Sequence, residues 1–220
     1  MLNIKIVELL GNGVFESLYM TVVSTFFAYV IGLPLGIVLV MTDKNGITPK
    51  PLLNGILGVI VNLLRSVPFI ILLVAIMPFT RAVVGTTLGS TATIVPLVVA
   101  AAPFVARMVE SSLKEVDAGV VEAALAMGAS PYRIVSRVML PEAKPSLIIG
   151  SAIAITTILS YSAMAGFVGG GGLGSIAINY GYYRYQTDIM LITVLFLVII
   201  VQVFQELGLR INKKSDKRIR

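Results

Sequence analysis

The chain has 220 residues and a net charge of +6; 57% of its residues are hydrophobic, only 13% are charged, and none is histidine, cysteine or tryptophan. Soluble proteins average about 45–50% apolar and about 25% charged residues, so this composition argues against both a disordered segment and an ordinary soluble domain. Because the chain lacks cysteine and histidine, it has no disulfides, thiolate or imidazole metal sites or histidine-based triads, and we expect no catalytic residue, metal or cofactor.

Charge-poor stretches recur along the chain, and a helix needs about 20 mostly apolar residues to cross a bilayer. We predict an all-α membrane protein in which residues 1–220 form a single transmembrane domain. Five membrane-spanning helices are expected at about residues 17–42, 66–80, 82–106, 145–168 and 189–207. The first span does not resemble a cleaved signal peptide, because only Lys5 precedes it and no small-residue cleavage site follows it. Residues 4–10 are predicted to form a separate short helix at the membrane interface.

Two of these spans have ambiguous borders. Arg65 interrupts the second apolar run and would be costly in contact with lipid, so the continuous helix is predicted to start near Pro68, after an approach segment at 51–64. Arg65 then either anchors a helix end at the interface or lines a pathway. The run that starts at Pro145 ends in glycine-rich and tyrosine-rich sequence, which favours one span followed by a loop or re-entrant segment.

Basic residues are distributed unevenly over the predicted loops. One side of the membrane would hold Lys44, Lys50, Arg107, Lys114, Arg133, Arg137, Lys144, Arg210, Lys213, Lys214, Lys217, Arg218 and Arg220. The other side would hold only Lys5, Arg81 and Arg184. Cytoplasmic loops are enriched in Lys and Arg, so the N-terminus is predicted outside and the C-terminus in the cytoplasm. The basic C-terminal end is expected to be a solvated tail, with binding to anionic lipid or nucleic acid as the alternative.

The longest polar segment, residues 107–144, is predicted to be a cytoplasmic loop that contains two short helices. The first is expected at Asp117–Met127, followed by Gly128 in a left-handed conformation. The second is expected at Pro131–Met139, and Pro141 is expected to stop it. Such a helix pair either lies on the lipid surface or forms a docking element for a soluble partner.

The same loop contains a recognisable pattern. Glu122, Ala123, Ala124, Gly128, Leu140 and Pro141 resemble the EAA motif of ABC-importer permeases, E-A-A-x3-G-x9-I-x-L-P, with Val138 at the usual Ile position. The resemblance implies a type I ABC-importer permease fold, in which this loop is the coupling element that inserts into a groove of the ATP-binding subunit. The two alanines would give a smooth contact surface and the glycine a sharp turn, while Glu122 would pair with a basic residue of the partner.

Further segments resemble the methionine-import permeases, a family of ABC importers. These segments are residues 62–73, 77–81, 102–110, 161–166 and the glycine-rich 169–174. The resemblance implies a homodimeric permease of the bacterial inner membrane that takes up an amino acid, with methionine expected, by alternating access. Its implied partners are two copies of an ABC ATP-binding subunit, an external substrate-binding protein of the lipoprotein type and membrane lipid, but no nucleic acid.

Missing motifs favour a non-catalytic subunit. The sequence has no G-x-x-x-x-G-K-[ST] segment that would cradle phosphates, so ATP hydrolysis would need a separate subunit. Gly169, Gly171 and Gly174 fit G-x-G-x-x-G, but no strand precedes them, and a glycine-rich loop is favoured over a dinucleotide site. The alternatives are a stand-alone secondary transporter or channel, which usually places ionisable residues within its spans, and a membrane anchor without a transport role.

A polar stretch of the fourth predicted span contains candidates for the translocation path. Ser160, Tyr161 and Met164 are the residues selected there. Serine and threonine in membrane helices also bond to the backbone or to a neighbouring helix, so a structural role for this stretch stays open.

Overall fold

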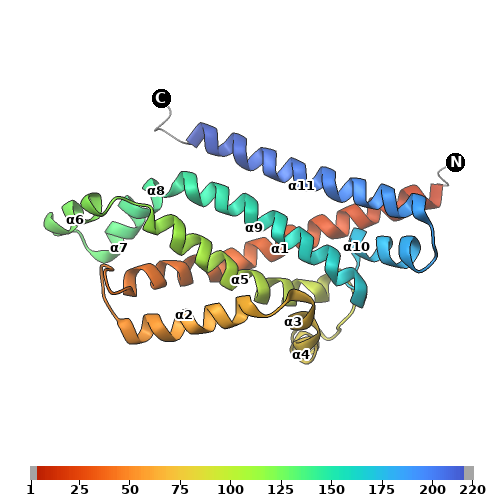
Figure 1. The fold of residues 1–220 in the computed structure, drawn as a ribbon, viewed down its shortest axis with the longest axis horizontal. Coiled ribbons are helices and arrows are strands. Elements are labelled where there is room, and N and C mark those ends of the chain that lie inside the picture. Colours follow the sequence, from red (N-terminus) through yellow and green to blue (C-terminus); the bar gives the residue numbers. More distant parts are fainter. Residues whose placement is uncertain (1–3, 216–220) are drawn as a thin grey trace. The chain divides into compact units, whose positions relative to one another are not determined.

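The computed structural model describes residues 4–215 (Figure 1). Within this range the chain is almost entirely helical and contains no strand, so the predicted all-α class is confirmed. The described residues divide into two compact units. Unit 1 contains residues 4–27, 67–101 and 155–205, and unit 2 contains residues 28–66, 102–154 and 206–215.

Four helices of the described chain are long and apolar enough to cross a membrane. They are α1 (Ile4–Thr42), α5 (Ser90–Lys114), α9 (Lys144–Met164) with its helical extension to Tyr182, and α11 (Thr187–Ser215). A fifth crossing is obtained if α2 (Pro51–Ser66) and α3 (Phe69–Ala75) are counted as one broken span. Length and composition therefore allow four or five crossings, and five is the number predicted from the sequence.

The first helix begins earlier than expected. α1 runs without a break from Ile4 to Thr42, so the separate interfacial helix predicted for residues 4–10 is wrong. Glycine at position 11 has open space around it and does not interrupt the helix, and Pro34 lies inside it. Proline is tolerated within membrane helices because neighbouring groups satisfy the backbone carbonyl that it leaves free.

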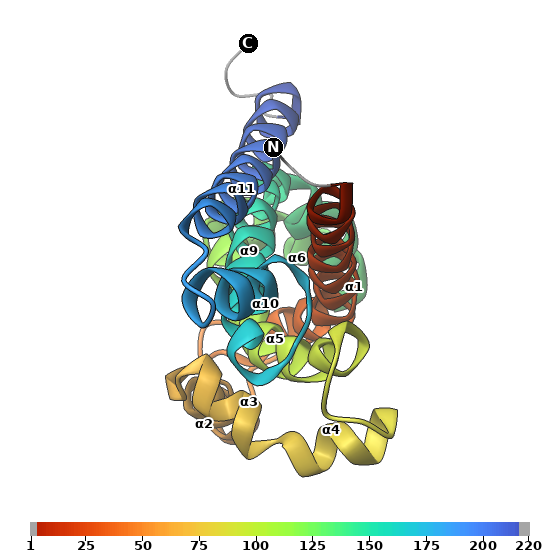
Figure 2. The same ribbon diagram turned by 90° about the vertical axis from the view of Figure 1, so that its right-hand side faces the viewer.

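The second predicted span, residues 66–80, does not form one helix. α2 ends at Ser66, and α3 and α4 (Met77–Val84) follow as two short helices (Figure 2). Pro68 separates α2 from α3, because proline lacks a backbone N–H and disfavours helical conformation in the residue before it. The predicted approach segment is thus a complete helix, and Arg65 is exposed in its last turn, where the carbonyl end of the helix favours a positive charge.

The third predicted span, residues 82–106, is displaced along the chain. Gly85 and Gly89 adopt left-handed conformations, with φ of 83° and 91°, and α5 begins only after this turn. The helix then continues through Arg107 and ends at Lys114. The first part of the predicted coupling loop is therefore helix α5, because its charged residues pair with one another and do not end the helix.

After α9, the glycine-rich sequence forms helical turns. A 3-10 turn (Ala165–Val168), α10 (Gly172–Ile176) and a π-helical turn (Ala177–Tyr182) follow one another. Two side chains of α1 hold this segment within unit 1. Glu16 Oε2 accepts a 2.6 Å hydrogen bond from the N–H of Gly172, and the Ser17 hydroxyl oxygen accepts one of 2.9 Å from the N–H of Leu173.

Candidate coupling surface and translocation path

The first loop helix, α6 (Ala118–Ala126), lies beyond the C-terminal end of α5 (Figure 1). Asp117 caps it: one carboxylate oxygen accepts hydrogen bonds from the N–H of Gly119 at 2.8 Å and of Val120 at 3.3 Å. Such a cap satisfies backbone donors that have no partner inside the helix. The predicted segment Asp117–Met127 corresponds to α6 together with its two cap residues.

The turn after α6 has the predicted conformation, because Gly128 adopts a left-handed φ of 75°. Its N–H donates to the carbonyl of Leu125 at 2.9 Å, and the N–H of Ala129 donates to that of Ala124 at 3.1 Å. These two bonds satisfy carbonyls at the helix end. A Cβ at Gly128 would meet no atom within 4 Å, so the backbone conformation, and not lack of space, calls for glycine there.

The second part of the loop contradicts the predicted stop at Pro141. α7 (Pro131–Ile134), a π-helical turn (Val135–Met139) and α8 (Leu140–Glu142) form a nearly continuous helical stretch up to α9. In the π turn, the N–H of Leu140 donates to the carbonyl of Val135, five residues earlier. This wider turn changes the register just before Pro141, where the ring would otherwise meet the carbonyl four residues back. Leu140 is half-buried and Pro141 is exposed.

The residues of the EAA pattern are divided between the surface and the interior of the loop. Glu122, Ala123 and Gly128 are exposed, whereas Ala124 is only 4% exposed and packs inward. Large apolar side chains on the loop are exposed as well: Val120, Leu125, Met127 and Tyr132. We call the exposed side of α6, formed by Val120, Glu122, Ala123, Leu125 and Met127, the α6 patch. It combines one carboxylate with apolar side chains that no other residue among 4–215 covers.

A groove of about 560 Å³ lies beside the α6 patch, within unit 2. Glu122 and Leu125 line one part of it, and Met139, Asp43 and Lys114 line others. The ammonium of Lys114 is 2.7 Å from Asp43 Oδ2. This hydrogen bond lowers the pKa of Asp43, so its carboxylate stays charged at neutral pH.

The three candidate path residues lie near one another in the part of α9 that belongs to unit 1. Ser160 is exposed, and its hydroxyl donates a 3.0 Å hydrogen bond to the carbonyl of Thr156. Met164, one turn further along, is 47% exposed. Tyr161 is half-buried, and its ring stacks on that of Phe69 from α3, with centroids 4.6 Å apart and an interplanar angle of 3°. Ser160 and Met164 thus share an exposed side of α9, while Tyr161 packs against a neighbouring helix.

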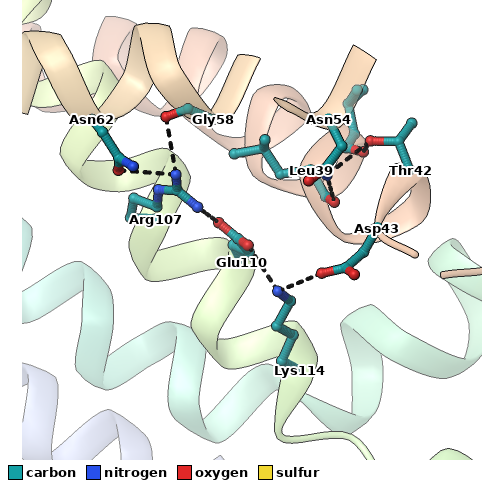
Figure 3. A network of polar contacts seen from close by, with 10 residues as sticks. Leu39, Thr42, Asp43, Asn54, Gly58, Asn62, Arg107, Glu110 and Lys114 are labelled. Carbon is teal, nitrogen blue, oxygen red and sulfur yellow. Dashed lines mark hydrogen bonds and ion pairs between the residues drawn. The ribbon is translucent and has the colours of Figure 1, made fainter. Parts of the chain in front are cut away.

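A network of charged residues next to the coupling loop was missed by the sequence analysis. Arg107 and Glu110 of α5 contact each other, and Lys114 contacts both Glu110 and Asp43 (Figure 3). The spacing contains a usable signal, because residues three and four apart on a helix are neighbours. Opposite charges at positions 107, 110 and 114 therefore predict ion pairs along one side of a helix that continues through them.

The polar contacts described above are a helix cap in the loop and ion pairs along the end of α5. Among residues 4–215, no group of three or more Asp or Glu residues is placed to hold a metal ion. The loop instead offers a helix that is fixed at both ends and exposes apolar side chains around one carboxylate. Buried aromatic and apolar contacts surrounded by polar groups are typical of protein interfaces, so this geometry suits the docking of another protein.

Comparison with known proteins identifies a matching family, similar proteins and a similar solved structure. The family described as "Binding-protein-dependent transport system inner membrane component" matches residues 32–220. Two relatives named "Probable D-methionine transport system permease protein MetI", from Vibrio cholerae and Pasteurella multocida, are 47% and 48% identical over 96% and 97% of this chain, and over 94% and 99% of their own lengths. A solved structure described as "Inward facing conformations of the MetNI methionine ABC transporter" has a TM-score of 0.96 at 48% identity, and the match covers 97% of this chain and 99% of that one.

Proposed function

The chain belongs to the family of binding-protein-dependent transport system inner membrane components, and we propose that it passes methionine into a bacterial cell as the permease of an ATP-driven importer. Relatives with almost half of their residues identical are named for D-methionine transport, and the alignments extend over nearly the whole of both chains. In this proposal the substrate crosses by alternating access, with a central cavity open to one side of the membrane at a time.

The observation that carries the proposal is the geometry of the coupling loop. The Asp117 cap and the left-handed Gly128 fix both ends of α6, so a force on this helix would displace it as a whole. We propose that the α6 patch, with Glu122 and Ala123 at its centre and Gly128 at its edge, contacts the ATP-binding subunit. Ala124, Leu140 and Pro141 would shape the loop that holds this surface.

Several partners belong to the proposal. The sequence has no phosphate-binding loop, so two copies of a separate ABC ATP-binding subunit would hydrolyse ATP. An external substrate-binding protein would deliver methionine, and a second copy of this chain would complete the cavity. Exposed large apolar side chains recur along the long helices: Phe15, Val22, Phe26, Leu191, Leu195, Val203 and Leu207. Apolar patches of this kind mark surfaces that lipid or another protein chain covers.

We propose that Ser160, Tyr161 and Met164 lie along the translocation path. The exposed side of α9 that Ser160 and Met164 share would face the cavity, and the thioether of Met164 is flexible and polarizable enough to adapt to a passing substrate. Tyr161 would act from a fixed position, because its ring is stacked on Phe69. The hydroxyl of Ser160, which is bonded to its own helix, would contribute its oxygen as an acceptor.

The distribution of basic residues between the two units supports the proposed orientation, with the N-terminus outside and the C-terminus in the cytoplasm. Of the described Lys and Arg residues, Lys5, Arg81 and Arg184 belong to unit 1, and all the others belong to unit 2. Unit 2 also contains the α1–α2 loop and the coupling loop. The segments that the charge pattern assigns to the cytoplasm are therefore neighbours in one compact unit.

Cysteine labelling tests this orientation in a chain that has no cysteine of its own. With Asn179→Cys, which replaces an exposed residue of unit 1, an impermeant thiol reagent should label intact cells. With Ser215→Cys, labelling should appear only after the membrane has been opened. Labelling of Ser215→Cys in intact cells would reverse the proposed orientation of the C-terminus.

Reconstitution tests the proposed function itself. The purified chain alone should neither bind nor hydrolyse ATP, and vesicles that contain it should not accumulate radiolabelled methionine. Both activities should appear when the ATP-binding subunit and the binding protein are added, and they should depend on ATP. Methionine uptake by the chain alone, driven by an ion gradient, would instead support a secondary transporter. Uptake of another amino acid, and not of methionine, by the complete system would support the permease role and contradict methionine as the substrate.

A further inference from the structure

One arginine of α5 connects this helix to α2 within unit 2 (Figure 3). Arg107 Nη2 donates to the backbone carbonyl of Gly58 at 3.1 Å and to Asn62 Oδ1 at 2.9 Å, and both acceptors belong to α2. Arg107 Nη1 donates to Glu110 Oε2 at 2.5 Å on its own helix. A single guanidinium, whose donors form a rigid planar fork, thus holds α2 at a fixed position along α5.

The network continues from α5 to the end of α1. Glu110 Oε1 is 2.9 Å from Lys114 Nζ, and the same ammonium is 2.7 Å from Oδ2 of Asp43, which directly follows the last residue of α1. Glu110 is 8% exposed and lies between two cations, so the four charged side chains balance one another. We call Arg107, Glu110, Lys114 and Asp43 the charge ladder.

A separate contact connects α1 directly to α2. Asn54 Nδ2 of α2 donates to the carbonyl of Leu39 at 2.6 Å and to Thr42 Oγ1 at 3.1 Å, and both acceptors are in the last turn of α1 (Figure 3). Each of the three helices is therefore joined to the other two by polar contacts. Three elements connected in this way cannot slide along one another without breaking at least one bond.

Backbone packing reinforces the pair α1–α5. A Cβ on Gly32 would lie 2.7 Å from the carbonyl oxygen of Ala102, and a Cβ on Gly36 would lie 2.6 Å from that of Ala106. The two glycines, four residues apart, let the helix backbones touch, as small residues do between membrane helices. Rotation of α1 against α5 is therefore blocked by direct backbone contact as well as by the charge ladder.

The energetics of such a network favour a positioning role. Only Glu110 is largely buried, whereas the side chains of Lys114 and Asp43 are 47% and 32% exposed, and ion pairs between exposed charges add little stability. The charge ladder therefore adds little stability that apolar packing would not supply. Its particular effect is to fix the register of the three helices. Each charged side chain meets its oppositely charged partner only when the helices keep these relative positions.

We propose that Arg107, Glu110 and Lys114 are positioning residues that make the ends of α1, α2 and α5 move with the coupling loop as one body. The inference rests on the proposed function of that loop. Only two residues separate Lys114 from Asp117, the cap of α6. A displacement of α6 therefore moves the end of α5, because the two-residue link is too short to absorb it by bending. The charge ladder then makes α2 and the end of α1 move together with α5.

The test uses the complete transporter in vesicles and measures ATP hydrolysed for each methionine taken up. Glu110→Gln keeps the shape of the side chain but leaves Arg107 and Lys114 without their shared anion. Assembly with the ATP-binding subunit should persist, because the α6 patch is untouched. The ratio of ATP to methionine should rise about tenfold, within the range usual for coupling between two sites. Arg210→Met, which removes the exposed Glu206–Arg210 pair of α11, is the matched control and should leave the ratio unchanged.

A second variant separates a mechanical link from general destabilisation. Asp43→Cys combined with Lys114→Cys removes the connection between the α1–α2 loop and α5, and the ratio should rise as in Glu110→Gln. A short bis-maleimide that bridges the two introduced thiols should bring the ratio back towards normal. This recovery would also be informative if Glu110→Gln failed to fold.

Two outcomes would overturn the inference. A normal ratio in Glu110→Gln and in the uncrosslinked cysteine pair would mean that the charge ladder only packs the helices. If the variants lose both assembly with the ATP-binding subunit and methionine uptake, the charge ladder merely supports the docking surface. The unmodified complex, measured beside the variants, reports separately on the proposed function. If the unmodified complex neither assembles with the ATP-binding subunit nor takes up methionine, the proposed function is wrong. That result does not depend on any substitution in the charge ladder.

Discussion

The variant Gly128→Val is expected to lose its ATP-binding subunit while the chain itself stays inserted and folded in the membrane. Gly128 has a left-handed φ of 75°, and valine opposes this conformation by about 1–2 kcal/mol. A penalty of this size reduces the docking-competent population by roughly 5–30-fold. It is too small to unfold the packed helices, but it strains the two hydrogen bonds from Gly128 and Ala129 that set the direction of α6.

Co-purification with the ATP-binding subunit measures this effect directly, and methionine uptake in vesicles measures its consequence. Gly85→Val is the matched control, because Gly85 also has a left-handed φ and open space around it but lies at the end of α4, in unit 1. It introduces the same backbone strain away from the coupling loop and should assemble normally. Lys114→Ala looks neutral from the sequence, since it lies outside the EAA pattern, but Lys114 is part of the charge ladder and is unsuitable as a control.

Normal assembly of Gly128→Val, at wild-type protein levels, would contradict the proposed role of α6. The loop would then be a helix pair at the lipid surface, which is the alternative that the sequence leaves open. A parallel loss in Gly128→Val and Gly85→Val would point to a general folding defect and would equally remove the argument for docking.

Charge-free runs predict where apolar helices exist but not where they begin and end. α1, α9 and α11 appear where the runs predict them, because a long apolar segment in a membrane has few alternatives to a helix. α5 extends into charged sequence, since Arg107, Glu110 and Lys114 neutralise one another along its surface. Pairing between residues distant in sequence, such as Lys114 with Asp43, leaves no local signal in the chain.

Turn chemistry was predictable where one backbone conformation decides the structure. The left-handed cap at Gly128 follows from glycine after a helical pattern, and the structure has it. Proline was a less reliable signal. Pro68 interrupts the helix between α2 and α3. Pro141, in contrast, lies within a helical stretch, because the preceding π turn accommodates it. The deciding factor at Pro141 is the hydrogen-bond register of neighbouring turns, which the residue type alone does not reveal.

Two glycines that follow α9, Gly166 in the 3-10 turn and Gly174 in α10, give the second prediction with a large effect. A Cβ on Gly174 would overlap the carbonyl oxygen of Ala163 and lie 2.6 Å from its Cα, and a Cβ on Gly166 would overlap the backbone carbon of Gly174. The obstacle on each side is backbone, which cannot rotate away as a side chain can. The contact explains Gly174 of the glycine-rich segment without any bound nucleotide.

Gly174→Ala is therefore expected to destabilise the chain severely, although it adds only one methyl group. Overpacking a dense interior costs about 1–3 kcal/mol when side chains can adjust, and here the backbone of α10 must move. With about 2–4 °C per kcal/mol for a chain of this length, the midpoint of thermal unfolding in detergent, followed by circular dichroism, should fall by about 10 °C. Gly11→Ala is the matched control: nothing lies within 4 Å of the added Cβ, and alanine in a helix is favoured by about 0.5–1 kcal/mol. Equal midpoints for the two variants would mean that α10 moves aside easily and that its contact with the end of α9 is not a tight backbone contact.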